Sequence, residues 1–209
     1  MNLIVSPHMD DEMLGCYSVL NRCGKTPGGG EVTVVYMTEG HADPFLSMKM
    51  VKECYSVAER YKVKQEFWGG KPNRFEVNPE WINRAEGIIY DSEGWDAVYL
   101  PHPDYNQDHR ATYEIWRTAL RVNDRARGTV PRVLTYEQPC TQQTMHNDFT
   151  PQYFRRIDGV QKGQDFIGIY SSQSRGHRNS AHIENLAFMR GDSIGCPAAE
   201  AFEVLRWIE

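Results

Sequence analysis

The sequence has little cysteine and no long apolar run. Its five cysteines are odd in number and show no CxxC spacing, so we expect reduced, partly buried thiols with no nucleophile among them. A membrane helix needs about 18 consecutive apolar residues, and no segment comes close to this length, so no membrane span is expected. The N-terminus also lacks a basic region followed by an apolar stretch, the pattern of a secretory signal. We therefore predict a cytoplasmic protein.

The chain has no excess of positive charge. Its net charge is −5 and its isoelectric point is near 5.8, which argues against binding to nucleic acids or to anionic membranes. It also has no internal repeat, low-complexity tract or linker. With 209 residues, 40% of them hydrophobic and 24% charged, it fits one domain over residues 1–209 that buries a sizeable core.

Strand-like and helix-like segments alternate in the first two thirds of the chain. Predicted strands cover residues 2–6, 31–38, 65–68, 97–100 and 133–136, and predicted helices cover residues 12–22, 48–61, 81–90 and 108–122. This order predicts a single-domain α/β fold with a mainly parallel sheet and helices on both faces. After residue 138 we expect an irregular loop over 138–154, of a length that is often functional. Helices over 167–174 and 181–189 and a last strand over 199–205 follow.

Polar residues gather where the predicted strands end. His8, Asp10, Asp11 and Glu12 directly follow the first strand, and a second cluster, residues 101–110, follows the strand at 97–100. In open α/β sheets, ligands bind outside the carboxyl ends of the strands. Three carboxylates close to one another repel unless a cation lies among them. The pattern therefore predicts a metal held between two loops, as in a metal-dependent hydrolase.

Two segments resemble a known family. Residues 7–12 (Pro-His-Met-Asp-Asp-Glu) resemble the P/A-H-P-D-D-E signature of the PIG-L/LmbE-like de-N-acetylases, and residues 106–111 (Asn-Gln-Asp-His-Arg-Ala) resemble their second motif. The turn at 170–173, the pair at 190–191 and residues 199–202 resemble the C-terminal part of the family. Members are zinc-dependent deacetylases of small molecules and lipids that contain N-acetylglucosamine. The resemblance thus implies a Rossmann-like, LmbE-type fold and a small N-acetylated substrate.

The same resemblance implies a metal site. His8, Asp11 and His109 would ligate Zn²⁺, and Asp10 would be the general base. Two imidazoles and one carboxylate leave a position open for water, and such a set also accepts other divalent metals such as Fe²⁺. The supporting residues are assigned as Glu12, which braces the loop, and Asp108, which orients an imidazole.

The chain departs from the family at Asn106. Many members have a histidine at this position, three residues before the zinc histidine, and asparagine cannot act as an acid. We therefore predict that His102, from the same loop, supplies the proton to the departing amine. Asp104 and Asp108 are expected to flank His102 and to favour its charged form.

Four residues are candidates for substrate binding: Asn106, Arg110, Arg190 and His41. Either arginine clamps a phosphate or sugar hydroxyls, or it forms a structural salt bridge. His41 either lines the pocket or lies on an exposed loop. The basic cluster at 175–178 either meets an anionic part of a substrate or is a solvated face.

We therefore predict a zinc-dependent hydrolase that removes an N-acetyl group from an N-acetylglucosamine-type sugar, glycoconjugate or nucleotide-sugar. An amide hydrolase acting on a non-sugar or a modified nucleoside is one alternative. A non-catalytic protein that binds a carbohydrate or a nucleotide is the other, and the intact Asp10 and metal-ligand positions favour an enzyme. The sequence leaves open whether the protein is a homo-oligomer.

Overall fold

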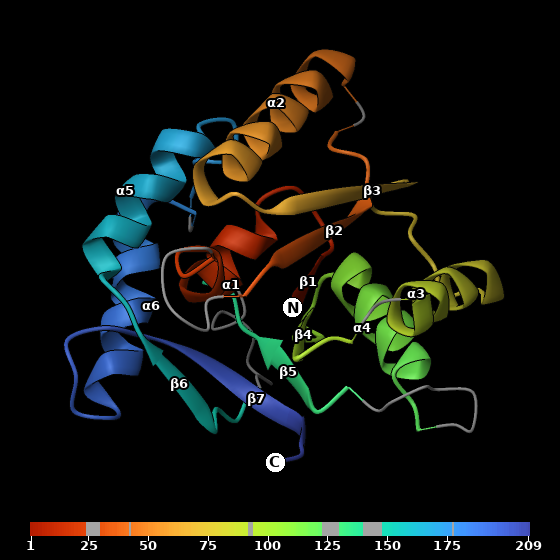
Figure 1. The fold of residues 1–209 in the computed structure, drawn as a ribbon. Helices are drawn as coiled ribbons and strands as arrows, with labels where there is room; N and C mark the ends of the chain where they lie inside the picture. Colours follow the sequence, from red (N-terminus) through yellow and green to blue (C-terminus); the bar gives the residue numbers. More distant parts are fainter. Residues whose placement is uncertain (24–29, 42, 92–93, 123–129, 140–147, 177) are drawn as a thin grey trace.

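The computed structural model describes residues 1–23, 30–41, 43–91, 94–122, 130–139, 148–176 and 178–209. A seven-stranded sheet in the order β3-β2-β1-β4-β5-β7-β6 forms its centre (Figure 1). The strands are β1 (Asn2–Ser6), β2 (Val32–Thr38), β3 (Lys64–Gly70), β4 (Ala97–Pro101), β5 (Arg132–Tyr136), β6 (Tyr153–Arg156) and β7 (Ala199–Trp207). The helices are α1 (Asp11–Leu20), α2 (Pro44–Tyr61), α3 (Pro79–Asp91), α4 (Gln107–Ala119), α5 (Gly159–Ile169) and α6 (Ser180–Asp192).

The sheet is mainly parallel, as predicted. Strands β1 to β5 all pair in parallel, and β7 runs antiparallel to both of its neighbours, β5 and β6. Strand β1 lies inside the sheet and pairs with β2 on one side and with β4 on the other, so the order of the strands reverses between β1 and β4. The loops that leave the carboxyl ends of β1 and β4 therefore lie next to each other, at the position where α/β sheets bind ligands.

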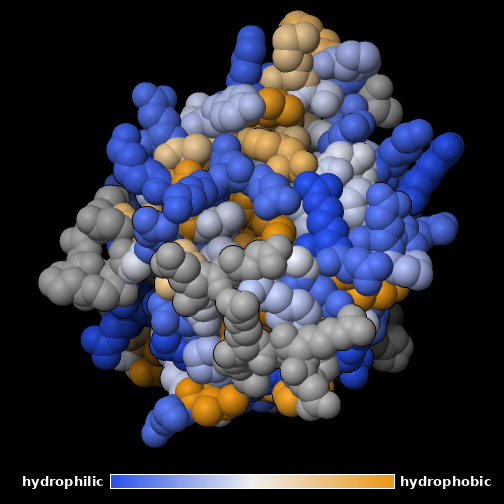
Figure 2. Space-filling model, turned by 45° about the vertical axis from the view of Figure 1, so that its right-hand side comes forward, coloured by the Kyte–Doolittle hydropathy of each residue, from blue (hydrophilic) through white to orange (hydrophobic). Residues whose placement is uncertain are grey.

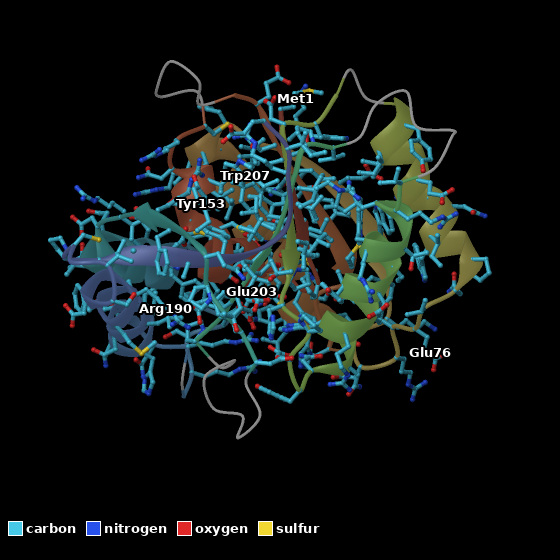
Figure 3. All side chains as sticks on the ribbon, turned by 90° about the horizontal axis from the view of Figure 1, so that it is seen from below. Met1, Glu76, Tyr153, Arg190, Glu203 and Trp207 are labelled. Carbon is cyan, nitrogen blue, oxygen red and sulfur yellow. The ribbon has the colours of Figure 1, made fainter. Side chains whose placement is uncertain are left out.

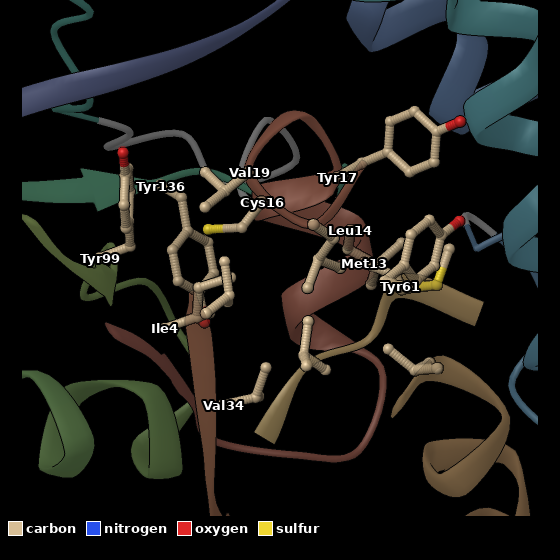
Figure 4. Packing of buried hydrophobic residues seen from close by; sticks show 14 of the residues in the cluster. Ile4, Met13, Leu14, Cys16, Tyr17, Val19, Val34, Tyr61, Tyr99 and Tyr136 are labelled. Carbon is tan, nitrogen blue, oxygen red and sulfur yellow. The ribbon is translucent and has the colours of Figure 1, made fainter. Parts of the chain in front are cut away.

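Helices cover both faces of the sheet because successive strand residues point to opposite sides. Ile4 of β1 belongs to one core cluster, with Met13 of α1 and Phe166 of α5. Its neighbour Val5 belongs to the other, with Ile115 of α4. Figure 4 shows part of the first cluster, where Ile4 and Val34 of the sheet pack with side chains of α1. The predicted α/β architecture with two helical layers is thus confirmed.

The prediction for the chain after residue 138 is wrong in two places. The end of the expected loop, residues 138–154, forms the start of β6, while residues 140–147 lie outside the described part. The helix expected over 167–174 is displaced, because α5 ends at Ile169 and a turn follows. Helix α5 begins well before residue 167, at Gly159, where the Asp158 side chain caps it by accepting a hydrogen bond from Gln161 N.

The surface in Figure 2 is mostly hydrophilic, with hydrophobic residues at its top, over α2, and in smaller groups lower on the same face. The first turns of α2 expose Phe45, Leu46 and Met48. Among the described helices, none combines the length and the apolar character that crossing a membrane requires.

Candidate metal centre

The loop after β1 brings a row of acids to the edge of the sheet. Ser6, the last residue of β1, donates a hydrogen bond from its hydroxyl to His8 O (2.7 Å) and accepts one from Glu12 N (3.1 Å). This closes the loop tightly, and α1 begins at Asp11. Asp10, Asp11 and Glu12 are completely buried. Their carboxylates are therefore held away from bulk water at the carboxyl end of β1.

The loop after β4 supplies the second imidazole. Asn106 caps α4 by accepting a hydrogen bond from Asp108 N (2.9 Å), and His109 follows in the first turn of the helix. Because β4 pairs with β1, this turn faces the loop that carries His8. The rings of His8 and His109 lie 5.2 Å apart between centroids.

The three predicted metal ligands converge. His8, Asp11 and His109 each offer a ligand atom, and these atoms all lie within 4.8 Å of one another. Asp11 Oδ2 lies between the two rings, 3.1 Å from His8 Nδ1 and 3.5 Å from His109 Nε2. The structure thus brings together residues that lie about 100 positions apart in the chain, as the sequence led us to expect.

A carboxylate holds the far nitrogen of each imidazole. Asp108 Oδ2 lies 2.9 Å from His8 Nε2, and Asp104 Oδ2 lies 2.9 Å from His109 Nδ1. Such contacts fix the tautomer and the orientation of a ligating histidine and make it a better ligand. The expected contact of Asp108 with an imidazole is present. The equivalent position of Asp104 was not foreseen.

The atoms around Asp11 fit a divalent cation. Within the described part of the chain, four buried atoms of this centre have no hydrogen-bond partner: Asp10 Oδ1, Asp11 Oδ1, Asp108 Oδ1 and His109 Nε2. A buried polar atom without a partner costs about 1–3 kcal/mol. A cation on His109 Nε2 and Asp11 would satisfy part of this group. Two nitrogens and a carboxylate are a donor set that suits Zn²⁺ or Fe²⁺.

Burial and neighbouring charges separate the acids of the centre. Burial raises the pKa of Asp10 to about 7, although the Arg178 guanidinium, whose Nη1 lies 2.6 Å from Asp10 Oδ2, opposes this rise. Burial likewise raises the pKa of Glu12 to about 8, against a hydrogen bond from the Tyr170 hydroxyl. Glu12 thus braces the loop through hydroxyl contacts, in line with the supporting role expected of it.

The predicted ligands Asp11 and His8 favour their charged forms, whereas burial favours the neutral forms of Asp10 and Glu12. Burial alone would raise the pKa of Asp11, but the imidazoles of His109 and His8 hold it well below its usual range. Burial alone would lower the pKa of His8, but the carboxylate of Asp11 and the contact with Asp108 raise it to about 10. The centre therefore keeps Asp11 ionised, which is the form that binds a cation.

His102 has other partners than predicted. Its Nδ1 lies 3.0 Å from Glu203 Oε2 and its Nε2 lies 3.1 Å from Asp148 Oδ1. The expectation that Asp104 and Asp108 flank it is wrong, because those carboxylates hold the two ligand histidines instead. Glu203, labelled in Figure 3, reaches His102 from β7, which pairs with β5. Burial lowers the pKa of His102, but the carboxylates of Glu203 and Asp148 raise it more, so the pKa lies above its usual value, as expected.

The two candidate arginines have protein partners. Arg190 of α6 donates from Nε and Nη2 to Glu137 (2.5 and 2.6 Å), which is the salt-bridge alternative (Figure 3 labels Arg190). Arg110 donates from Nη1 to Asp104 O (2.8 Å) and so supports the loop that holds His109. Contacts of either arginine with a substrate stay predictions.

The other two candidates for substrate binding, Asn106 and His41, lie at the N-terminal ends of helices. Asn106 uses its side-chain oxygen as the cap of α4. His41 lies on an exposed loop, where its Nδ1 accepts a hydrogen bond from Asp43 N (2.9 Å) just before α2. Their roles in substrate binding also stay predictions.

Sequence reasoning missed the residues that hold Asp10 and Glu12. Tyr170 and Arg178 belong to the connection between α5 and α6, and they lie 158 and 168 positions from their partners. The sequence marked the turn at 170–173 only as a family resemblance, and it marked the cluster at 175–178 as either a contact with an anionic part of a substrate or a solvated face. No local pattern signals contacts at such separations, so only the folded chain reveals them.

Comparison with known proteins identifies the family. The family model PIG-L, described as GlcNAc-PI de-N-acetylase, matches residues 3–120, more than half of the chain. The chain belongs to the PIG-L family. The match includes both loops of the metal centre, and it ends before the connection that carries Tyr170 and Arg178.

Solved structures share the LmbE-type fold. The conserved protein TT1542 from Thermus thermophilus is 19% identical, with a TM-score of 0.78 over 100% of this chain and 95% of that one. N,N'-diacetylchitobiose deacetylase from Pyrococcus horikoshii is 21% identical, with a TM-score of 0.74 over 98% and 83%. GalB, the 4-carboxy-2-hydroxymuconate hydratase from Pseudomonas putida, is 15% identical, with a TM-score of 0.78 over 100% and 98%. No curated protein matches the chain significantly. At these identities the structures establish the fold alone.

Proposed function

We propose that this PIG-L family protein is a metal-dependent hydrolase that removes the acetyl group from an N-acetylglucosamine-type sugar, glycoconjugate or nucleotide-sugar. The observation that carries the proposal is the convergence of His8, Asp11 and His109 on one point, next to the buried carboxylate of Asp10. The description of the family and the chitobiose deacetylase among the structural neighbours support the same reaction class. A cytoplasmic location and self-association stay predictions.

His8, Asp11 and His109 would hold the metal, for which Zn²⁺ is the first candidate and Fe²⁺ the second. When bound, a divalent ion supplies a Lewis acid that makes water more acidic and polarises a carbonyl group. Asp104 and Asp108 keep both imidazoles in the orientation that presents their free nitrogens to the ion.

Asp10 is the proposed general base. Its carboxylate accepts a proton from the water that attacks the acetamide carbonyl, and acetate and a free amine are the products. Its full burial and its position next to Asp11 support this role. Glu12 is less suited to act as the general base, because its carboxylate already accepts hydrogen bonds from the hydroxyl groups of Ser6 and Tyr170, which brace the loop.

His102 is the proposed donor of the proton to the departing amine. Its contact with Glu203 is fixed, because Thr135 also donates to the same carboxylate (3.0 Å). The side chain of its other partner, Asp148, is 87% exposed and is therefore the partner that a substrate can replace. This leaves His102 Nε2 as the nitrogen that gives up the proton.

The test is a screen for acetate release with metal content measured on the same preparation. One set of compounds contains N-acetylated sugars and nucleotide-sugars, and a second contains N-acetylated nucleosides and non-sugar acetamides. We expect release from the first set, and loss of both metal and release in His109→Ala. Release from the second set alone would assign the protein to the alternative class of amide hydrolases. No release from either set by fully metal-loaded protein would refute deacetylation.

A further inference from the structure

The connection between α5 and α6 contacts the two acids that flank Asp11 in the metal loop, Asp10 and Glu12. At its start, the Tyr170 hydroxyl donates to Glu12 Oε1 (2.5 Å). Near its end, Arg178 Nη1 donates to Asp10 Oδ2 (2.6 Å). Both residues lie after residue 120, beyond the part of the chain that the family model matches. Residues of the second half of the chain therefore complete the surroundings of the proposed base.

The connection is itself held in place at several points. Glu53 of α2 accepts hydrogen bonds from Ser172 N (3.0 Å) and from the Ser171 hydroxyl (3.2 Å). At the other end, Arg178 N donates to Arg175 O (2.8 Å), and Asn179 caps α6. Because Arg178 N is bonded and Asn179 caps α6, the guanidinium of Arg178 reaches Asp10 from a defined direction.

The contact makes the two oxygens of Asp10 different. Arg178 holds Oδ2 in a charge-assisted hydrogen bond, and its side chain is only 13% exposed, so solvent weakens the contact little. Oδ1 is also buried, and it has no hydrogen-bond partner within the described residues. A single oxygen of the carboxylate is thus left for another donor.

We propose that Arg178 is a positioning residue for Asp10, which holds Oδ2 so that Oδ1 accepts the proton of the attacking water. This inference rests on the proposed function. In the step, one O–H bond of water breaks and one O–H bond forms at Oδ1. The oxygen of the water bonds to the acyl carbon, and the π electron pair of the C=O bond moves onto the carbonyl oxygen. Nothing is oxidised or reduced. The arginine keeps its proton and its charge throughout.

Positioning explains the contact better than substrate binding does. An arginine that binds an anionic group of a substrate needs an accessible guanidinium, whereas Arg178 is largely covered and bonded to a fully buried acid. A displaced catalytic group lowers the rate of the chemical step, and an error of about 1 Å can cost on the order of 100-fold. The two roles therefore differ in whether kcat or KM changes.

A double-mutant cycle separates an action through Asp10 from an independent one. Arg178→Met should lower kcat by about 10- to 100-fold with little change in KM, and Arg178→Lys should restore part of the loss. In the Asp10→Asn background the same substitution should lower the residual kcat only slightly, because the effects of residues that act as a unit are not additive. The matched control is Arg175→Met, which removes an equal charge from an exposed side chain of the same connection and should change neither constant.

Two results would overturn the inference. An equal loss of kcat in both backgrounds would mean that Arg178 does not act through Asp10. A raised KM at unchanged kcat would make it a substrate contact. Metal affinity and the midpoint of denaturant unfolding, measured on the same variants, should stay close to those of the parent, since Arg178 bonds to Asp10, which is not a proposed ligand.

A measurement on the metal-free protein keeps this test apart from the proposed function. If the wild type releases no acetate from any compound, the function fails, and the contact is then judged by NMR. The guanidinium signal that disappears in Arg178→Met should show slow proton exchange in the wild type and fast exchange in Asp10→Ala. Fast exchange in the wild type would show that Arg178 does not hold Asp10, whatever the reaction is.

Discussion

Removal of the carboxylate behind either ligand histidine should weaken metal binding without removing a ligand. Asp104 and Asp108 each lie 2.9 Å from the far nitrogen of a ligand imidazole, and both side chains are almost completely covered. Loss of such a partner typically lowers metal affinity by about 10- to 100-fold, which corresponds to roughly 1.4–2.8 kcal/mol. Asparagine keeps an acceptor oxygen and loses the charge. We therefore expect Asp104→Asn and Asp108→Asn to fall near the lower end, at about 10-fold.

The asparagine variants are preferable to alanine at position 108. Asp108 Oδ2 also accepts a hydrogen bond from Asn73 N (2.7 Å), so alanine would leave a backbone donor without its partner and lower the stability of the fold as well. Asp148→Asn is the matched control. It removes the same charge from a carboxylate on a histidine, His102, that is not a proposed ligand, and it should leave metal affinity unchanged.

The assay is a titration of Zn²⁺ against a chromophoric chelator at fixed pH, because ligand protonation competes with metal binding. Affinities of Asp104→Asn and Asp108→Asn within about twofold of the wild type would refute the reasoning, since contacts of this kind are worth at least several-fold. A loss of equal size in Asp148→Asn would show that the effect reflects net charge alone.

The remaining predictions concern the base, the acid, the packing of α1 and the metal. Asp10→Asn should retain the metal and lose about 10²- to 10⁴-fold in kcat for acetate release, and a near wild-type rate would assign the base elsewhere. His102→Gln should remove the basic limb of the pH–rate profile. Burial lowers the pKa of His102, but Glu203 and its other partner raise it overall, so this limb should lie above about pH 6.5 in the wild type, and activity should fall as pH rises through it. An unchanged profile in this variant would mean that His102 is no acid. In Gly15→Ala the new methyl group would overlap the ring of Tyr136, and we expect a loss of about 1–3 kcal/mol in the free energy of unfolding, measured with urea. A variant as stable as the wild type would show that the ring moves freely. Addition of a chelator should lower the midpoint of thermal unfolding, because a ligand that binds only the folded state stabilises it, and a constant midpoint would argue against a bound metal.

The sequence was most informative where polar residues directly follow an apolar strand. The end of β1 and the end of β4 could be located from their apolar runs, and the parallel order of the strands then placed both loops at one edge of the sheet. For that reason a metal site between these two loops could be predicted, whereas the choice of His8, Asp11 and His109 came from the family resemblance. The contact of Asp108 with an imidazole followed from the general chemistry of ligating histidines.

The sequence was least informative where buried residues are polar. Helix α5 buries Lys162 and Asp165, which bond to Glu200 and to tyrosine hydroxyls, so its covered face shows no apolar period. The strand β6 is short and partly exposed, and it is recognised only by its pairing with β7. The prediction of which carboxylates contact His102 was wrong for a related reason. Glu203 reaches the ring through an antiparallel pairing about 100 residues along the chain, which spacing within one loop cannot reveal.

Three adjacent acids in this loop acquire different roles from their different partners. Asp11 lies between two imidazoles, which keep it ionised, so it is suited to bind a cation. One oxygen of Asp10 accepts a hydrogen bond from the positively charged guanidinium of Arg178. The second oxygen is buried and has no hydrogen bond in the described structure, so Asp10 is suited to accept a proton there. Glu12 accepts hydrogen bonds from the hydroxyl groups of Tyr170 and Ser6, and burial raises its pKa to about 8, so it remains mostly neutral near pH 7 and is suited to hold the loop. Neighbouring carboxylates whose surroundings separate their pKa values take different parts in a reaction. Since Arg178 and Tyr170 both come from the connection between α5 and α6, the proposed division of roles within the N-terminal motif depends on the C-terminal half of the chain.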